Sequence, residues 1–304
     1  MILSCGEALI DMLPRKSAAG EDAFAPYPGG AVFNTAIALG RLGVPAGFFS
    51  GISSDFLGQT LLDSLSASGV DHSAVALSDR PCTVAFVKLV DGQATYAFYD
   101  ENTAGRLLSV ADLPKVRADA LFFGGISLMV EPCGATYEAL MAREAPRAVT
   151  MIDPNIRPSF IRDRRAYRAR IDRMLRLADI VKLSDEDLHW LMGEGGIPEL
   201  ARKILAMGPR LVCITEGAKG ATGFTNADNV FVAATPVTVA DTVGAGDTFN
   251  AGILAALHQR GALNKEAVAT LDAGAVHAAL SMGVKAAAVT VSRAGANPPW
   301  AHEL

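Results

Sequence analysis

The chain has 304 residues, of which half are hydrophobic and 19% are charged, and its formal net charge is −5. This length and composition suit a compact globular enzyme and exclude a disordered or fibrous protein. The acidic balance argues against a nucleic-acid-binding protein, since the one basic cluster, residues 157–176, is interrupted by acidic and apolar residues. We interpret that cluster as the solvated face of a helix.

The sequence predicts a cytoplasmic protein that binds no membrane. The first residues, MILSCGEALIDMLP, carry Glu7 and Asp11 within an apolar run, which is unlike a signal peptide. Apolar runs stay well short of the ~20 residues of a membrane span. The four cysteines are far apart and form no C-x-x-C pair, so we expect buried free thiols and neither disulfides nor a zinc site.

Short apolar runs alternate along the chain with longer helix-like segments. The expected strands cover residues 2–5, 46–49, 120–123, 148–152, 180–182 and 211–215. The expected helices cover residues 34–42, 56–68, 133–144, 166–178 and 197–207. This alternation predicts βαβ units and an α/β fold with a mostly parallel sheet covered on both faces.

Two pairs of strands depart from this alternation. Residues 83–90 and 95–100 flank Asp91-Gly92, which predicts a β-hairpin, and residues 9–15 and 24–27 flank a polar loop. Neither pair leaves room for a crossover helix, so we expect both to be antiparallel and to form a small sheet that projects from the main one. An edge hairpin and a lid over a substrate pocket are equally consistent with this pattern.

The end of the chain is predicted to be helical. Residues 247–260 carry an apolar face, residues 265–282 follow, and an Ala-rich helix is expected over 285–293.

The most informative segment is Asp241-Thr-Val-Gly-Ala-Gly-Asp-Thr-Phe-Asn-Ala-Gly252. A Gly-Ala-Gly turn that opens into a helix presents unpaired N–H groups to an anion, and the helix dipole adds to their effect. Asp247 then lies where a carboxylate can take a proton from a hydroxyl beside a transferring phosphoryl group. A lone Asp after glycines is more often a helix cap; the length of this motif favours the catalytic interpretation.

This segment resembles the C-terminal signature of the ribokinase-like (PfkB) carbohydrate kinases, and residues 28–43, PGGAVFNTAIALGRLG, resemble the N-terminal one. The two signatures occur in the expected order, and the resemblance covers nearly the whole chain. It implies one domain, residues 1–304, with a three-layer α/β/α ribokinase-like fold and a small β-sheet lid of about residues 9–28 and 82–101.

The resemblance implies a role for each matching residue. Asp247 is expected to be the catalytic base, and Gly244, Ala245 and Gly246 are expected to form the anion hole. The residues expected to hold the sugar hydroxyls are Asp11, Gly29, Gly30 and Asn34. Taken alone, Asn34 could equally be the N-cap of the helix that follows it.

For ATP, the resemblance implies that the turn Thr215-Glu-Gly217-Ala-Lys-Gly220 lines the nucleotide groove and that Gly246 lies near the phosphates. Without the resemblance, this turn is as consistent with an ordinary turn as with a site.

The family also has an N-x-x-E element near Mg²⁺ and the phosphates. Here Ser184 stands in the Asn position and Asp187 in the Glu position, and both still offer oxygen to a hydrated ion. Asp241 and the Val243 carbonyl correspond to ligands of a monovalent cation, K⁺, that many members bind.

Within the family, the chain is most similar to bacterial fructokinases. Phe98, Asp100 and Arg157 are the further residues expected at the sugar. Asp100 stands where a 2-keto-3-deoxygluconate kinase has an arginine for the acid group, and a carboxylate there would repel an acidic sugar. Fructose is therefore favoured. A 2-keto-3-deoxygluconate kinase, another sugar or nucleoside kinase and a sugar-binding regulator stay as alternatives, and a homodimer through the lid is expected.

Overall fold

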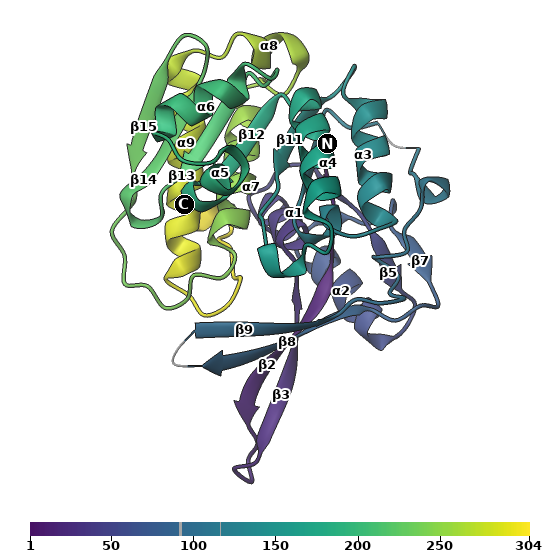
Figure 1. Cartoon of the computed structure of the whole chain (residues 1–304). Helices are drawn as coiled ribbons and strands as arrows, with labels where there is room; N and C mark the ends of the chain where they lie inside the picture. The colour runs from purple at the N-terminus through teal and green to yellow at the C-terminus, as the bar shows by residue number, and fades with distance from the viewer. Residues whose placement is uncertain (91–92, 116) are drawn as a thin grey trace.

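The structure is a computed structural model that describes residues 1–90, 93–115 and 117–304. Within these residues, the centre of the molecule is a nine-stranded sheet with the order β15-β14-β13-β12-β11-β10-β1-β4-β6 (Figure 1). Its strands are β1 (Ile2–Cys5), β4 (Ala46–Phe49), β6 (Val70–Asp71), β10 (Ala120–Gly124), β11 (Val149–Asp153), β12 (Ile180–Ser184), β13 (Leu211–Thr215), β14 (Gly220–Phe224) and β15 (Asn229–Ala233). The expected strands are all present, with ends shifted by at most one or two residues.

The sheet is parallel from β6 to β13 and antiparallel only at β14 and β15. Successive residues of a strand point to opposite faces, so the apolar runs fill two cores. On β1, Ile2 packs in one core and Leu3 in the other, and on β10 Phe122 and Phe123 divide in the same way. This explains why the central strands carry apolar residues on both faces and not only at alternate positions.

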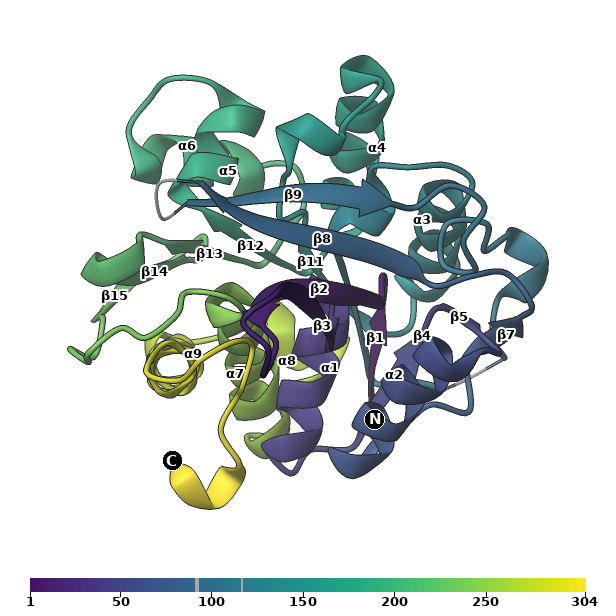
Figure 2. The same ribbon diagram turned by 90° about the horizontal axis from the view of Figure 1, so that it is seen from below.

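Helices cover both faces of the sheet (Figure 2). One layer contains α1 (Ala31–Arg41), α2 (Phe56–Ala67), α7 (Ala245–Gln259), α8 (Lys265–Ala269) and α9 (Ala273–Val291). The other contains α3 (Cys133–Glu144), α4 (Arg164–Leu177), α5 (Asp185–Met192) and α6 (Ile197–Leu205). Short 3₁₀ turns are η1 (Val110–Asp112), η2 (Ile126–Leu128), η3 (Pro158–Phe160), η4 (Gly217–Lys219) and η5 (Ala301–Glu303). The predicted three-layer α/β/α fold is confirmed.

The C-terminal helices differ from the prediction. One helix was expected over 265–282 and another over 285–293, whereas the break falls at residues 270–272 and α9 runs through to Val291. Asp272 causes this break, because its side chain accepts a hydrogen bond from Ala275 N and caps α9. Gly283 does not end the helix, since it lies against α7, where a Cβ on Gly252 would come within 2.6 Å of its Cα.

By length and composition alone, α9 could cross a membrane. In this fold it packs along α7 and against β14 and β15, as a core helix of the domain does.

A second sheet of four strands projects from the body, with the order β3-β2-β8-β9 (Figures 1 and 2). It consists of β2 (Leu9–Lys16), β3 (Asp22–Gly29), β8 (Thr83–Val90) and β9 (Gln93–Tyr99). We call it the lid sheet. Both predicted strand pairs are antiparallel, while β2 and β8 run parallel to each other. The expected turn at Asp91-Gly92 lies outside the described residues. A further pair, β5 (Gly51–Ser53) with β7 (Ala76–Ser78), lies at the side of the body.

The register of the lid sheet sorts its side chains onto two faces. Asp11, Ala85 and Phe98 stand opposite one another across β2, β8 and β9, so they share one face. Met12 and Phe86 belong to the other face, which we call the outer face of the lid sheet.

Candidate active site

The candidate residues gather at the carboxyl edge of the central sheet. Glu7 follows β1, while Asp153, Ser184 and Thr215 end the neighbouring strands β11, β12 and β13. The chain continues from β1 to β4 on one side and later returns to β10 on the other, which makes β1 a topological switch point. Open α/β sheets bind ligands at the carboxyl edge beside such a point.

The Gly-Ala-Gly turn leads directly into α7. Gly244 is the N-cap of this helix with a left-handed φ of 79°, a conformation that glycine adopts without steric cost. A Cβ on Gly244 would also lie 2.8 Å from Ala296 Cβ. The first N–H groups of a helix have no acceptor four residues back, and that of Ala245 makes only a long 3.4 Å bond to the Thr242 carbonyl. The turn thus has the geometry of an anion site.

Asp247 lies in the first turn of α7 and is 7% exposed. Its Oδ2 accepts a 2.9 Å hydrogen bond from Asn34 Nδ2, and its carbonyl accepts a 3.1 Å bond from Thr35 Oγ1. Burial raises the pKa of Asp247 to about 7, against the lowering effect of the Asn34 bond. The carboxyl is not a helix cap, because Gly244 occupies the cap position. A carboxyl with this pKa can accept a proton near neutral pH.

The paired glycines connect β3 to α1. A Cβ on Gly29 would lie only 2.2 Å from Asp11 Oδ2, so the Asp11 carboxylate rests against the bare Cα of this glycine. Gly30 is the N-cap of α1 with φ 110°, which places Asn34 inside the helix and shows that it is not the cap. Burial raises the pKa of Asp11 to about 6. The predicted sugar residues are therefore linked in sequence: Asp11 contacts Gly29, Gly30 caps α1, and Asn34 of α1 bonds to Asp247.

Glu7 was not among the predicted site residues, but its carboxylate bonds to the backbone next to the paired glycines. Its Oε1 accepts a 2.9 Å hydrogen bond from Ala31 N, and its Oε2 accepts a 3.3 Å bond from Ser127 N of η2. Burial raises the pKa of Glu7, and these backbone bonds oppose the rise. Glu7 precedes the predicted Asp11 by four positions, but nothing in the sequence pattern separates it from an ordinary polar residue after a strand.

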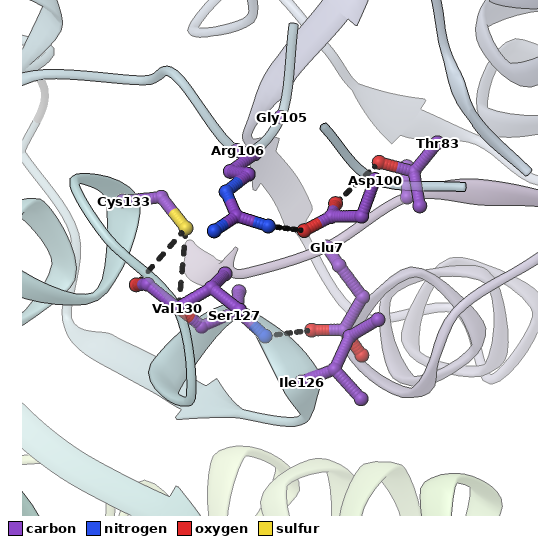
Figure 3. Close-up of a pocket in the computed structure, with 10 residues that line it drawn as sticks. Glu7, Thr83, Asp100, Gly105, Arg106, Ile126, Ser127, Val130 and Cys133 are labelled. Carbon is purple, nitrogen blue, oxygen red and sulfur yellow. Dashed lines mark hydrogen bonds and ion pairs between the residues drawn. The ribbon is translucent and has the colours of Figure 1, made fainter. Parts of the chain in front are cut away.

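Glu7 also lines a small pocket at the base of the lid sheet (Figure 3). On the opposite wall, Asp100 Oδ2 pairs with Arg106 Nη1 at 3.1 Å, and Asp100 Oδ1 accepts a 3.0 Å bond from Thr83 Oγ1. Arg106 thus neutralises Asp100. The expected repulsion of an acidic sugar does not follow from Asp100 alone, because its charge already has a partner.

The other two expected sugar residues lie farther out. Phe98 packs edge-on against Phe160 of η3 with ring centroids 5.0 Å apart. Arg157 is exposed, and its Nη1 donates a 3.0 Å hydrogen bond to the Ile156 carbonyl.

The expected nucleotide residues lie at the ends of β12 and β13 and in the η4 turn. Thr215 ends β13, Gly217 begins η4 and Gly220 follows it, and the two glycines have φ of 54° and 131°. Gly220 has no room for a side chain, since a Cβ would lie 2.2 Å from the Val232 carbonyl oxygen. Ser184 is the N-cap of α5, where its Oγ accepts from Asp187 N at 3.0 Å.

The expected metal residues fall in two places, with Asp187 on α5 and with Asp241 and Val243 in the segment before α7. Asp187 is buried and its Oδ1 accepts a 3.1 Å bond from Ile156 N. Both oxygens of Asp241 accept backbone bonds, from Val243 N at 3.0 Å and Gly295 N at 2.9 Å. In the described part of the chain, no three acidic, His or Cys side chains form a metal cluster. Mg²⁺ needs only one or two carboxylates when nucleotide phosphates supply the rest, so this donor set fits it.

A buried polar cluster lies behind the turn. Lys182 Nζ is 2.9 Å from Asp153 Oδ2, which also accepts a 2.8 Å bond from Asn250 Nδ2 on α7. No role for these three side chains was expected from the sequence. Nothing in the sequence marks Lys182 as a site residue, because it stands singly within an apolar strand.

A model of the family "pfkB family carbohydrate kinase" matches residues 1–303. The chain belongs to this family. It is therefore a sugar kinase, a phosphotransferase with an alcohol group as acceptor.

Among curated relatives of this carbohydrate kinase, a fructokinase of Rhizobium leguminosarum bv. trifolii is 59% identical over 274 residues, 90% of this chain and 84% of the relative. Among solved structures, a fructokinase of Xylella fastidiosa superposes with a TM-score of 0.90 at 27% identity and covers 99% of this chain and 96% of its own. A fructokinase of Vibrio cholerae O395 with bound fructose, ADP and calcium has a TM-score of 0.84 at 26% identity, with coverages of 97% and 94%.

Proposed function

We propose that this carbohydrate kinase transfers the γ-phosphoryl group of ATP to D-fructose and releases fructose 6-phosphate and ADP. The observation that carries the proposal is the buried Asp247 carboxyl at the start of α7, bonded to Asn34 at 2.9 Å. The 59% identity to a fructokinase supports fructose as the acceptor.

In the proposed reaction, Asp247 takes the proton of the 6-hydroxyl as the oxygen attacks the γ-phosphorus. The new O–P bond forms while the bond to the β-phosphate oxygen breaks, and ADP leaves with its electron pair. The N–H groups of Gly244, Ala245 and Gly246 face the charge that develops on the phosphoryl oxygens. Base and anion hole share one helix turn, so their separation is fixed before substrate binds.

For sugar binding, we assign Asp11 and Asn34 to the hydroxyl groups and the bare backbone of Gly29 and Gly30 to close approach of the ring. Phe98 shares the face of the lid sheet that carries Asp11, which supports an apolar contact with the sugar. Asp100 and Arg157 remain proposed contacts.

For ATP, we assign the groove to Ser184, Thr215, Gly217 and Gly220, with Gly246 at the phosphates. When bound, Mg²⁺ would neutralise charge on the β- and γ-phosphates, and Asp187 is the carboxylate we assign to it. The Asp241 carboxylate and the Val243 carbonyl are the proposed ligands of K⁺. Because ATP is the phosphate donor, we place the enzyme in the cytoplasm.

We further propose that the lid sheet covers the sugar and that its outer face pairs with a second copy of the chain. Phe24, Phe86 and Tyr99 form a row of edge-to-face contacts there, with centroids 5.1 and 5.6 Å apart. Phe24 is 47% and Tyr99 64% exposed, so the row is an apolar surface that a partner would cover. We expect a dimer by sedimentation at micromolar concentration and a monomer for Phe24→Glu. A monomeric parent protein would contradict the pairing.

The proposed substrate is tested by coupled ADP release from Mg·ATP with fructose, glucose, ribose, 2-keto-3-deoxygluconate and adenosine. We expect kcat/KM for fructose to exceed that for each other acceptor by at least tenfold. A preference for the acidic sugar would overturn the assignment of fructose. Equal turnover without any acceptor would indicate ATP hydrolysis and contradict sugar phosphorylation.

A further inference from the structure

Lys182 occupies an unusual place for a lysine, inside the central sheet. It is 5% exposed on β12, and its partner Asp153 at the end of β11 is 2% exposed. Taking both charges out of water costs several kcal/mol, and an apolar pair of similar size is often at least as stable. A contribution to the stability of the fold therefore does not by itself explain this ion pair.

The ammonium of Lys182 lies directly behind the anion-binding turn. A Cβ built on Gly246 would come within 3.1 Å of Lys182 Nζ. Gly246 is one of the three residues whose N–H groups face the phosphoryl group in the proposed reaction. A side chain at this position would stand between the turn and the ammonium, and glycine leaves the approach open.

Asp153 holds the ammonium in this position and is itself held by α7. Its Oδ2 accepts from Lys182 Nζ at 2.9 Å and from Asn250 Nδ2 at 2.8 Å. In the described part of the chain, Asn250 Oδ1 is buried without a hydrogen-bond partner. The amide therefore contributes to the site by donating to Asp153. Because Asn250 and Asp247 are on the same helix, α7 links the cluster to the proposed base.

Carboxyl groups surround Lys182. Asp153, Asp187 of α5 and Asp247 of α7 all favour its charged form. Burial lowers the pKa of Lys182, but these carboxylates outweigh it and the pKa lies above its ordinary value. The site thus keeps a permanent positive charge in a water-poor environment, where electrostatic interactions are strongest.

We propose that Lys182 supplies a fixed positive charge behind the Gly-Ala-Gly turn that stabilises the phosphoryl group during transfer. The inference rests on the proposed roles of Asp247 and of this turn. Charge on the phosphoryl oxygens is spread in the transition state, and a cation already in place needs no reorganisation when the reaction occurs. Lys182 has a second effect, since its charge lowers the pKa of Asp247 and keeps more of the base ionised at neutral pH.

The test replaces Lys182 by methionine, which has a similar length and no charge. We expect kcat to fall about a hundredfold with KM for fructose and for ATP within threefold, because the charge acts on the transition state. The matched control is Lys265→Met. Lys265 forms a 2.6 Å ion pair with Asp179, which precedes β12 at the opposite edge of the sheet. The kcat of Lys265→Met should stay within twofold of that of the parent enzyme.

Asp153 loses its partner in Lys182→Met, and a buried unpaired charge can unfold the protein. The double variant Lys182→Met/Asp153→Asn removes both charges and avoids this problem. We expect it to fold and to keep the hundredfold loss of kcat. A folded double variant with kcat within threefold of the parent enzyme would overturn the proposal.

The pH profile separates the charge from a structural role. The groups that face Asp247 are Asn34 from α1, Asp153 from β11, Lys182 from β12 and Glu7 from the loop after β1. In Lys182→Met the acid limb of kcat/KM should move to higher pH, because the cation that lowers the pKa of Asp247 is gone. Asp247→Asn is measured in parallel. If that variant is inactive while Lys182→Met has full activity and an unmoved acid limb, the role of Lys182 is wrong and the proposed function stands.

Discussion

Asn34 Nδ2 donates a 2.9 Å hydrogen bond to Asp247 Oδ2 across 213 residues of sequence. The bond joins the first turn of α1, which follows the paired glycines, to the first turn of α7, which follows the Gly-Ala-Gly turn. Each of the two family signatures thus contributes one partner. The sugar-binding turn and the proposed base are held in a fixed relation, and the bond also favours the ionised form of the base.

Asn34→Ala should make the enzyme more sensitive to acid. Burial already raises the pKa of Asp247 to about 7, and the bond from Asn34 lowers it, so its removal raises the pKa further. At pH 7 we expect kcat/KM to fall roughly tenfold or more, with a smaller loss at pH 9, where the carboxyl is ionised in both proteins. The pH profile of kcat/KM for fructose measures this. Thr35→Val removes hydrogen bonds to the carbonyls of Ala31 and Asp247 but none to the Asp247 carboxylate, so it should leave the acid limb in place.

Gly29→Ala should weaken sugar binding specifically. The new Cβ would lie 2.2 Å from Asp11 Oδ2, so the carboxylate must move away from the sugar-binding turn. We expect KM for fructose to rise about tenfold or more and KM for ATP to change less than threefold. The control is Gly20→Ala at the exposed tip of the same hairpin, where a Cβ meets nothing within 4 Å and alanine at a φ of 82° strains only the local turn. Unchanged KM for fructose in Gly29→Ala would contradict the role of Asp11.

Asp247→Asn should stabilise the folded protein, and more so at high pH. The pKa of Asp247 is about 7 in the folded protein, well above the ordinary value of 3.8. Because the pKa is raised in the folded protein, the folded state holds its proton at a pH where the unfolded chain has lost it. The contribution of this group to the free energy of unfolding is therefore complete below the unfolded pKa and is lost as the pH rises to about 7. The ionised carboxyl therefore costs most stability above pH 7. At pH 8.5 we expect Tm to rise by a few degrees, which corresponds to a gain in the free energy of unfolding on the order of 2 kcal/mol. At pH 5 we expect a smaller rise of Tm. Equal shifts of Tm at both pH values would contradict the raised pKa.

Much of the fold follows from local patterns. Apolar runs bounded by glycine and proline predict the parallel strands, because those strands are buried on both faces. The lid strands were predictable from pairs too close in sequence for a crossover helix. The antiparallel strands β14 and β15 were missed, since β14 contains Gly223 and β15 alternates half-buried and exposed positions at the sheet edge. The break before α9 was misplaced, because Asp272 acts through its side chain and Gly283 through packing with α7.

The candidate site likewise contains residues that the sequence could predict and residues that it could not. Residues carried by a contiguous motif, such as Asp247 and Asn34, were predictable from the sequence. Lys182, Asp153 and Asn250 were not, because their cluster forms only when β11, β12 and α7 meet. Likewise, the pairing of Asp100 with Arg106 depends on how the chain turns back after β9, and residue spacing alone did not indicate it.

Asp247 is the proposed base of sugar phosphorylation, and the steady-state turnover of fructose by Asp247→Asn at pH 8 tests this role. Circular dichroism and sugar binding by calorimetry should match the parent enzyme, since asparagine has nearly the same shape. We expect kcat to fall by roughly a thousandfold or more, because a positioned base contributes about 10²–10⁴ and the anion hole cannot replace it. A kcat within tenfold of the parent enzyme would contradict the account.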